Sequence, residues 1–250
     1  MAHVPHDIFD GRAAPNYDAD SADRFAPEVL GPTADLLAEL AGDGAALELA
    51  IGTGRVALAL HERGVDVQGI DISTPMVAEL RAKPGGDAIP VTIGDMATTE
   101  LDQTFRLAYL VFNTITNLTT QDEQVRCFAN AARHLEPGGR FVVEVLVPEL
   151  RRLPPGDAHR AFTVTPTHLG FDEYDLVANI LRSNHWFLRD GGLQVFVSTH
   201  RYVWPAEMDL MARMAGLELE HRWAGWEREP FTAESENTVS VWRKGTSSEG

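Results

Sequence analysis

Short apolar runs alternate with amphipathic stretches along most of the chain, starting near residue 33. Several apolar runs have the length of buried strands: 45–50, 65–70, 89–93, 107–112 and 140–147. The stretches between them have the period of helices: 33–40, 54–63, 75–83 and 121–135. Strands and helices that alternate at this spacing predict a parallel sheet with right-handed crossovers, as in a doubly wound α/β fold.

The alternation ends after residue 149. Residues 176–188 and 193–204 flank the turn Asp190-Gly191-Gly192 and predict a long β-hairpin. A helix and two strands are then expected at 205–215, 217–223 and 238–243. We therefore predict three regions: an N-terminal cap segment (1–32), an α/β domain (33–149 and 205–244) and an antiparallel β insertion (150–204).

The composition narrows the class of protein. The chain has 250 residues, 44% of them hydrophobic, and a formal net charge of −16. This is typical of a globular protein, and the negative charge works against binding to nucleic acid or an anionic membrane. The one cysteine, Cys127, forms no intramolecular disulfide and no cysteine zinc site. With no apolar signal segment and no membrane-length apolar run, we expect a cytoplasmic protein without nucleic-acid, membrane or metal partners.

A glycine-rich loop follows the first predicted strand and opens a helix. Its sequence, Gly52-Thr53-Gly54, lets the backbone turn sharply and approach a ligand closely. Asp71 ends the next predicted strand, where a carboxylate can accept hydrogen bonds from ribose hydroxyls. The loop alone fits two cofactors: a nicotinamide dinucleotide, or another cofactor that carries adenosine.

Two further acidic positions favour the second cofactor class. Glu48 stands where a dinucleotide site usually has an apolar residue, and a carboxylate there favours a cationic ligand such as a sulfonium or an ammonium. Asp95 and Met96 follow the third predicted strand, where a carboxylate can accept from an adenine amino group and a methionine can cover the ring.

Together these motifs resemble the class I S-adenosylmethionine-dependent methyltransferases. The resemblance rests on Glu48-Leu-Ala-Ile-Gly-Thr-Gly54, Gly69-Ile-Asp71-Ile-Ser73, Gly94-Asp95-Met96 and Leu135-Glu-Pro-Gly-Gly139, and it covers about residues 33–243. The late insertion is similar to that of the small-molecule branch with amino-sugar N,N-dimethyltransferases of actinomycete natural-product pathways. The resemblance implies a Rossmann-like seven-stranded sheet with the last strand antiparallel. It also implies a set of residues that bind S-adenosylmethionine: Glu48, Gly52, Thr53, Gly54, Asp71, Ile72, Asp95, Met96 and Phe112.

The acceptor must reach the methyl group from the carboxyl edge of the sheet. Candidate acceptor-binding residues lie at strand ends and in the insertion: Asn113, Asn117, Glu144 and Trp186. Candidate catalytic residues are Tyr17, His168 and His185, because a histidine of near-neutral pKa can act as a base. For Asn117, however, we favour the role of a helix cap over contact with the acceptor. We expect His200 to pack or to face solvent, and His134 to lie on the surface.

Methyl transfer from a sulfonium needs alignment and exclusion of water more than a catalytic motif. We therefore expect transfer of a methyl group to a small molecule of secondary metabolism, with nitrogen favoured over an aromatic oxygen or carbon. An NAD(P)-dependent oxidoreductase is the alternative enzyme, and a binding or scaffold module with a methyltransferase-like fold is the third interpretation. The chain is expected to be a monomer or a homodimer.

Overall fold

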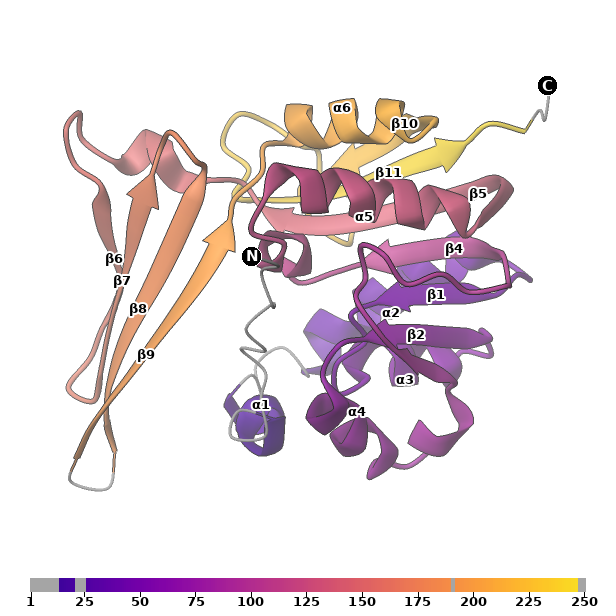
Figure 1. Ribbon diagram of the computed structural model, residues 1–250, viewed down its shortest axis with the longest axis horizontal. Coiled ribbons are helices and arrows are strands. Elements are labelled where there is room, and N and C mark those ends of the chain that lie inside the picture. The colour runs from indigo at the N-terminus through magenta and orange to yellow at the C-terminus, as the bar shows by residue number, and fades with distance from the viewer. Residues whose placement is uncertain (1–13, 21–25, 190–191, 247–250) are drawn as a thin grey trace.

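A seven-stranded sheet forms the centre of the larger part of the molecule (Figure 1). The computed structural model describes residues 14–20, 26–189 and 192–246. The strand order is β10-β11-β5-β4-β1-β2-β3. Strand β11 runs antiparallel to both of its neighbours, β10 and β5. The five strands β5, β4, β1, β2 and β3 run parallel to one another. The strands are β1 Ala46–Leu49, β2 Val67–Asp71, β3 Val91–Ile93, β4 Phe105–Leu110, β5 Leu135–Leu146, β10 Leu217–Trp223 and β11 Asn237–Lys244. The predicted fold class, with its antiparallel last strand, is confirmed.

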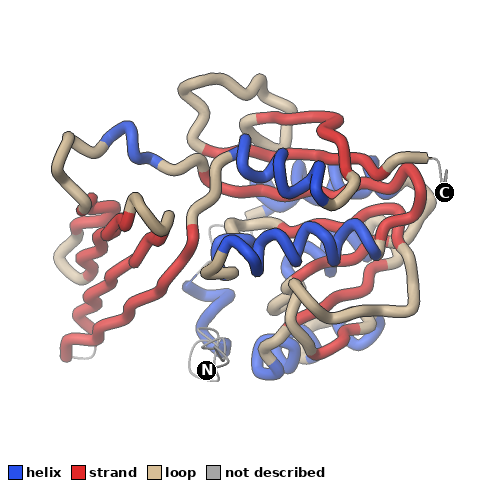
Figure 2. Tube along the Cα trace, turned by 45° about the horizontal axis from the view of Figure 1, so that its top comes forward, coloured by secondary structure: helices blue, strands red, loops and turns tan. Residues whose placement is uncertain are grey.

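Helices cover both faces of this sheet (Figure 2). They are α2 Pro27–Ala41, α3 Arg55–His61, α4 Thr74–Arg81, α5 Gln121–Arg133 and α6 Pro205–Met214. Apolar side chains of α5 and α6 pack on one face, with Phe128 edge-on to Phe141 and Trp242, and those of α2, α3 and α4 pack on the other. A short helix, α1 Ala14–Asp20, lies beside α4. Neither it nor the other described helices are long and apolar enough to cross a membrane.

A second sheet of four antiparallel strands follows β5 in the chain. Its order is β6-β7-β8-β9, and its strands are β6 His159–Val164, β7 His168–Asp175, β8 Ile180–Arg189 and β9 Gly192–Arg201. The predicted hairpin corresponds to β8 and β9. Asp190 and Gly191 of its predicted turn lie outside the residues that the structure describes. The chain enters this sheet from the carboxyl end of β5, so the sheet stands opposite the carboxyl edge of the parallel strands (Figure 1).

The boundary between α5 and β5 differs from the prediction. The helix ends at Arg133, and β5 begins at Leu135 and includes the Pro137-Gly138-Gly139 segment that we expected to precede the strand. Gly138 has φ +78°, and a Cβ on Gly139 would lie 3.0 Å from the carbonyl oxygen of Glu136. Glycine therefore lets this segment turn tightly and remain in the sheet.

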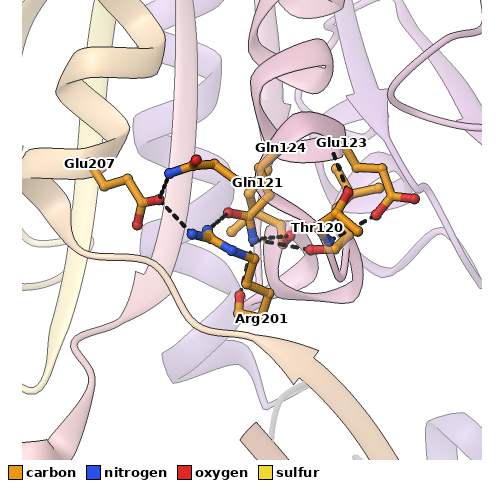
Figure 3. Close-up of polar contacts among 8 residues, drawn as sticks. Thr120, Gln121, Glu123, Gln124, Arg201 and Glu207 are labelled. Atoms are coloured by element: carbon orange, nitrogen blue, oxygen red, sulfur yellow. Dashed lines mark hydrogen bonds and ion pairs between the residues drawn. The ribbon is translucent and has the colours of Figure 1, made fainter. Parts of the chain in front are cut away.

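A buried polar network fastens the end of β9 to the α/β domain (Figure 3). The guanidinium of Arg201 donates to Oε1 of Gln124 (2.5 Å) and to Oε1 of Glu207 (2.7 Å). The Gln124 amide donates back to the backbone oxygen of Arg201 at 3.0 Å. The buried Arg201 thus joins α5 and α6 to the last residue of the second sheet.

Candidate active site

The glycine loop turns the chain from β1 into α3 at the carboxyl edge of the sheet. Gly52 and Gly54 have φ values of +58° and +75°, in the left-handed region that favours glycine. A Cβ on Gly54 would lie 2.2 Å from Cδ1 of Leu80, so the loop packs closely on α4. The sequence predicted both the loop and its position.

Asp71 braces this loop from the end of β2. Its Oδ2 accepts a hydrogen bond from the backbone nitrogen of Gly52 (2.6 Å), and its Oδ1 accepts one from that of Ser73 (2.7 Å). A carboxylate at the carboxyl end of a parallel strand is the kind of group that accepts from a ribose hydroxyl in folds of this class. Ile72, the next residue, is exposed, as expected for a side chain that covers a ligand.

A buried carboxyl group lies in the floor beside the loop. Glu48 of β1 is paired in register with Tyr109 of β4, and the Tyr109 hydroxyl donates to its Oε2 at 2.9 Å. Burial raises the pKa of Glu48 to about 8, while the hydrogen bond from Tyr109 and the charge of Arg55 act in the opposite direction. A cation bound near this group would favour its ionised form.

Asp95 and Met96 lie just after β3, at the same edge. The Asp95 Oδ1 accepts from the backbone nitrogen of Ala97 at 2.7 Å, and Met96 is buried. The side-chain amide of Asn130 on α5 donates to the carbonyl oxygens of Met96 (2.9 Å) and Thr99 (3.0 Å). These bonds fix the backbone that carries the two predicted adenine residues.

A strained turn follows β4. Phe112 and Asn113 have φ values of +68° and +59°. The carboxylate of Glu144 accepts from the backbone nitrogen of Phe112 and from the indole of Trp226, both at 3.0 Å, and the Asn113 amide oxygen accepts from the backbone nitrogen of Leu146 at 2.6 Å. Glu144 and Asn113 thus hold the turn at the strand end, and their predicted contact with the acceptor stays a prediction.

A cleft lies between the glycine loop, the β4 turn and α1. Its lining includes Tyr17, Glu48, Leu49, Ala50, Ile51, Gly52, Thr53, Arg55, Val56, Val111, Phe112 and Thr114. Asp18 of α1 accepts a hydrogen bond from the Thr53 hydroxyl (2.6 Å) and forms an ion pair with Lys83. These contacts hold the predicted residue Tyr17 over the cleft.

Asn117 lies three residues beyond Thr114, at the end of the short helix η3 Thr114–Asn117. Its Oδ1 is 3.1 Å from Nδ1 of His200, whose Nε2 is 2.8 Å from the hydroxyl of Ser198. Thr120, not Asn117, caps α5, so the helix-cap interpretation of Asn117 is wrong. His200, which was expected to pack or to face solvent, is half-buried and hydrogen-bonded through both ring nitrogens.

The histidines of the second sheet form a stacked pair. Nε2 of His168 lies 3.0 Å from Nδ1 of His185, and the His168 ring stacks on Phe187 at 4.1 Å between centroids. Trp186 stacks on Phe171 instead, on the opposite face, because successive residues of a strand alternate. The structure therefore brings together the two predicted histidines but separates them from Trp186.

Tyr109 and Arg55 belong to the site but were not predicted from the sequence. Tyr109 is recognisable as a site residue only from the strand register, which places it opposite Glu48. Arg55 is recognisable from its position at the start of α3. Its guanidinium lies 4.3 Å from the centroid of the Phe112 ring. No group of three or more His, Cys, Asp or Glu side chains in the described part of the chain could hold a metal ion.

The residues of this edge fit S-adenosylmethionine. Three carboxylates, those of Glu48, Asp71 and Asp95, lie at or just after the ends of successive strands β1, β2 and β3. The cofactor presents cationic groups, ribose hydroxyls and an adenine amino group, all of which carboxylates can bind. Gly52, which has no side chain, lines the cleft between these carboxylates and the turn after β4.

Several known proteins with similar sequences and folds are methyltransferases. Residues 46–139 match a family model described as a methyltransferase domain. The cypemycin N-terminal methyltransferase from a Streptomyces species is 30% identical over 94% of this chain and 96% of its own length. The CcbJ methyltransferase from Streptomyces caelestis is 38% identical, with a TM-score of 0.77 over 86% of this chain and 88% of its own.

CalS10, an amino pentose methyltransferase from Micromonospora echinaspora solved with S-adenosylmethionine bound, shares the fold. It has a TM-score of 0.69 at 23% identity and covers 91% of this chain and 96% of its own. The near-complete relatives decide between the two cofactors that the glycine loop left open, and the cofactor is S-adenosylmethionine. The chain belongs to the class I S-adenosylmethionine-dependent methyltransferases.

Proposed function

We propose that this enzyme methylates an amine nitrogen of a small molecule of secondary metabolism. One observation carries the proposal: the relative named for methylating an N-terminus matches 94% of this chain, and so includes most of the second sheet as well as the cofactor domain. A relative that matches only the cofactor domain would say little about the acceptor, because the acceptor-binding elements of a fold vary independently of it.

The geometry of the cleft supports a mechanism based on alignment. Bound S-adenosylmethionine would supply the methyl group of its sulfonium, and the neutral thioether S-adenosylhomocysteine would be the leaving group. Glu48 and Asp71 would hold the cofactor beside the glycine loop, and Tyr17 of α1 lines the same cleft. The second sheet would cover the acceptor and exclude water. An amine in its neutral form then needs only to face the methyl group in line with the sulfur.

The proton that the amine releases can pass to a neutral imidazole. Burial and the neighbouring His168 lower the pKa of His185, so this ring is neutral at physiological pH and can accept a hydrogen bond or a proton. In this proposal, the His168–His185 pair is the proton acceptor and Tyr17 and Asn117 border the acceptor amine.

An aromatic acceptor is the second candidate. Five ring contacts with centroid distances of 4.1–6.3 Å connect four aromatic side chains of the second sheet: Phe162, His168, His185 and Phe187. A planar phenol or indole could stack on these rings, with methylation at oxygen or carbon.

A panel of acceptors tests the proposal. The purified enzyme is incubated with S-adenosylmethionine and, separately, an amino sugar, a short peptide with a free N-terminus, a phenol and an indole, and S-adenosylhomocysteine release and product mass are measured. We expect turnover with an amine and a shift of one or two methyl groups in its mass. Turnover with the phenol or the indole alone would contradict the amine proposal and support the aromatic one.

A control separates a failed acceptor choice from a failed enzyme. S-adenosylhomocysteine should raise the melting temperature, whereas NAD(P) should not. Peptides with a blocked N-terminus should not be methylated. Methylation of the blocked peptide at the same rate would show that the acceptor atom is not the terminal amine.

A further inference from the structure

Ser198, His200 and Asn117 form a continuous hydrogen-bonded chain between β9 and η3. Asn117 Oδ1 can only accept, so Nδ1 of His200 carries the hydrogen and donates across the 3.1 Å contact. Nε2 is then the unprotonated nitrogen and accepts from the Ser198 hydroxyl at 2.8 Å. The contacts therefore select one tautomer of His200 and one orientation of the Asn117 amide.

This chain borders the cofactor cleft. Residues three apart on a 3₁₀ helix lie on the same side, so Asn117 follows Thr114 along one side of η3. Thr114 lines the cleft, and β9 packs against η3. His200 thus approaches the cleft from the second sheet, on the face shared with His185.

The imidazole is uncharged in the functional pH range. Burial, with a smaller contribution from the nearby His185 on β8, lowers the pKa of His200 to about 4. The groups that face the ring from η3 and β9, Asn117 and Ser198, carry no charge. A neutral ring does not repel a sulfonium or an amine, so polar contact is available here without an electrostatic penalty.

We propose that His200 is a positioning residue for the acceptor: it fixes the Asn117 amide so that Oδ1 accepts an N–H of the acceptor amine through its second lone pair. This rests on the proposed function. The attacking nitrogen must direct its lone pair at the methyl group, so its hydrogens must be held by acceptors at the side. An amide oxygen already oriented by a histidine is such an acceptor, and no reorientation is needed when the substrate binds.

Three variants of His200 separate this role from simple packing. Asparagine can reproduce the Nδ1 donor, glutamine reaches only toward Nε2, and alanine reproduces neither. The KM is measured with the acceptor from the panel that the enzyme methylates. His200→Ala and His200→Gln should raise the KM for this acceptor about five- to tenfold, the range expected for one lost hydrogen bond. His200→Asn should recover most of that loss, and the KM of S-adenosylmethionine should not change in any of them.

The neighbour Thr199 gives the matched control, because it lies on the opposite face of β9. Thr199→Ala should leave both KM values unchanged. The double variant His200→Ala/Asn117→Ala should be no worse than Asn117→Ala alone, since the two residues act as one unit. Equal impairment of the asparagine and glutamine variants, or additive losses in the double variant, would overturn the proposal.

Nitrogen NMR of the histidine rings tests the geometry without an acceptor. At neutral pH, His200 should be a neutral ring protonated at Nδ1, and Asn117→Ala should shift its Nδ1 signal. A ring protonated at Nε2 would overturn the proposal even if the enzyme methylates amines. Conversely, the enzyme could methylate a phenol and show the same changes in KM in the His200 variants. That result would support the positioning role of His200 and contradict the proposed amine acceptor.

Discussion

The hydroxyl of Tyr109 donates a hydrogen bond of 2.9 Å to Oε2 of Glu48, between two side chains that are paired in register on neighbouring parallel strands. The pair is buried, and burial raises the pKa of Glu48 to about 8. Without a ligand, the carboxyl group therefore keeps its proton at neutral pH. Its stabilising contribution is present at low pH and is lost as the pH rises through about 8.

Binding of S-adenosylmethionine should release a proton from Glu48. The positive charge of the cofactor favours the ionised carboxylate, so calorimetry at about pH 7.4 in two buffers of different ionisation enthalpy should detect proton release. Glu48→Gln should remove that release and weaken binding by about tenfold, because a charge-assisted interaction is lost. The same proton release in Glu48→Gln as in the natural protein would show that another group titrates.

Asp71→Ala should weaken the binding of S-adenosylhomocysteine by at least about tenfold. The variant loses both the ribose contact and the two hydrogen bonds that hold the loop backbone at Gly52 and Ser73. Asp71→Asn keeps one acceptor oxygen and should lose less. Isothermal calorimetry measures both, and unchanged affinity in Asp71→Ala would rule out the assigned ribose contact.

Arg201→Met should lower the free energy of unfolding by about 3 kcal/mol, because it leaves Glu207 and Gln124 without their buried partner. The matched control is Asp35→Asn at the pair with Arg63, where the Asp35 side chain is 72% exposed. That change should cost under about 0.5 kcal/mol. Urea unfolding compares the two, and similar losses would mean that the Arg201 network does not anchor the second sheet.

His200 should make stability depend on pH. Its pKa is lowered from 6.5 to about 4 in the folded protein, so its contribution is present above pH 6.5 and is lost as the pH falls toward 4. His200→Asn keeps a donor to Asn117 but does not titrate. Unfolding at a series of pH values should show a shallower acid-side slope in the variant, by up to about 1.4 kcal/mol per pH unit. Parallel slopes would contradict the lowered pKa.

The α/β domain was predictable because its strands are buried runs and its helices are periodic. Topology then places the ends of β1, β2 and β3 at one edge, which is why Glu48, Asp71 and Asp95 could be assigned to one site from sequence. The helix α2 begins at Pro27, earlier than predicted, since Pro32 and Gly31 interrupt the pattern without ending the helix.

The second sheet was only half predicted because both its faces are partly exposed. In β6 exposed and half-buried residues do not alternate, so no period-two signal marks the strand. His134 was also misjudged: it is buried, and its Nε2 accepts from the backbone nitrogen of Leu101 at 2.8 Å. The burial of His134 and the partial burial of His200 come from chain segments distant in sequence, which local patterns do not report.

The most direct test of amine methylation is the position of an isotopically labelled methyl group in the product. The enzyme is given S-adenosylmethionine labelled in its methyl carbon together with the amine acceptor that the panel identifies, and the purified product is examined by NMR. We expect the labelled carbon to couple to the hydrogens and nitrogen of an N-methyl group. A labelled carbon bonded to oxygen or to a ring carbon would contradict the proposed function.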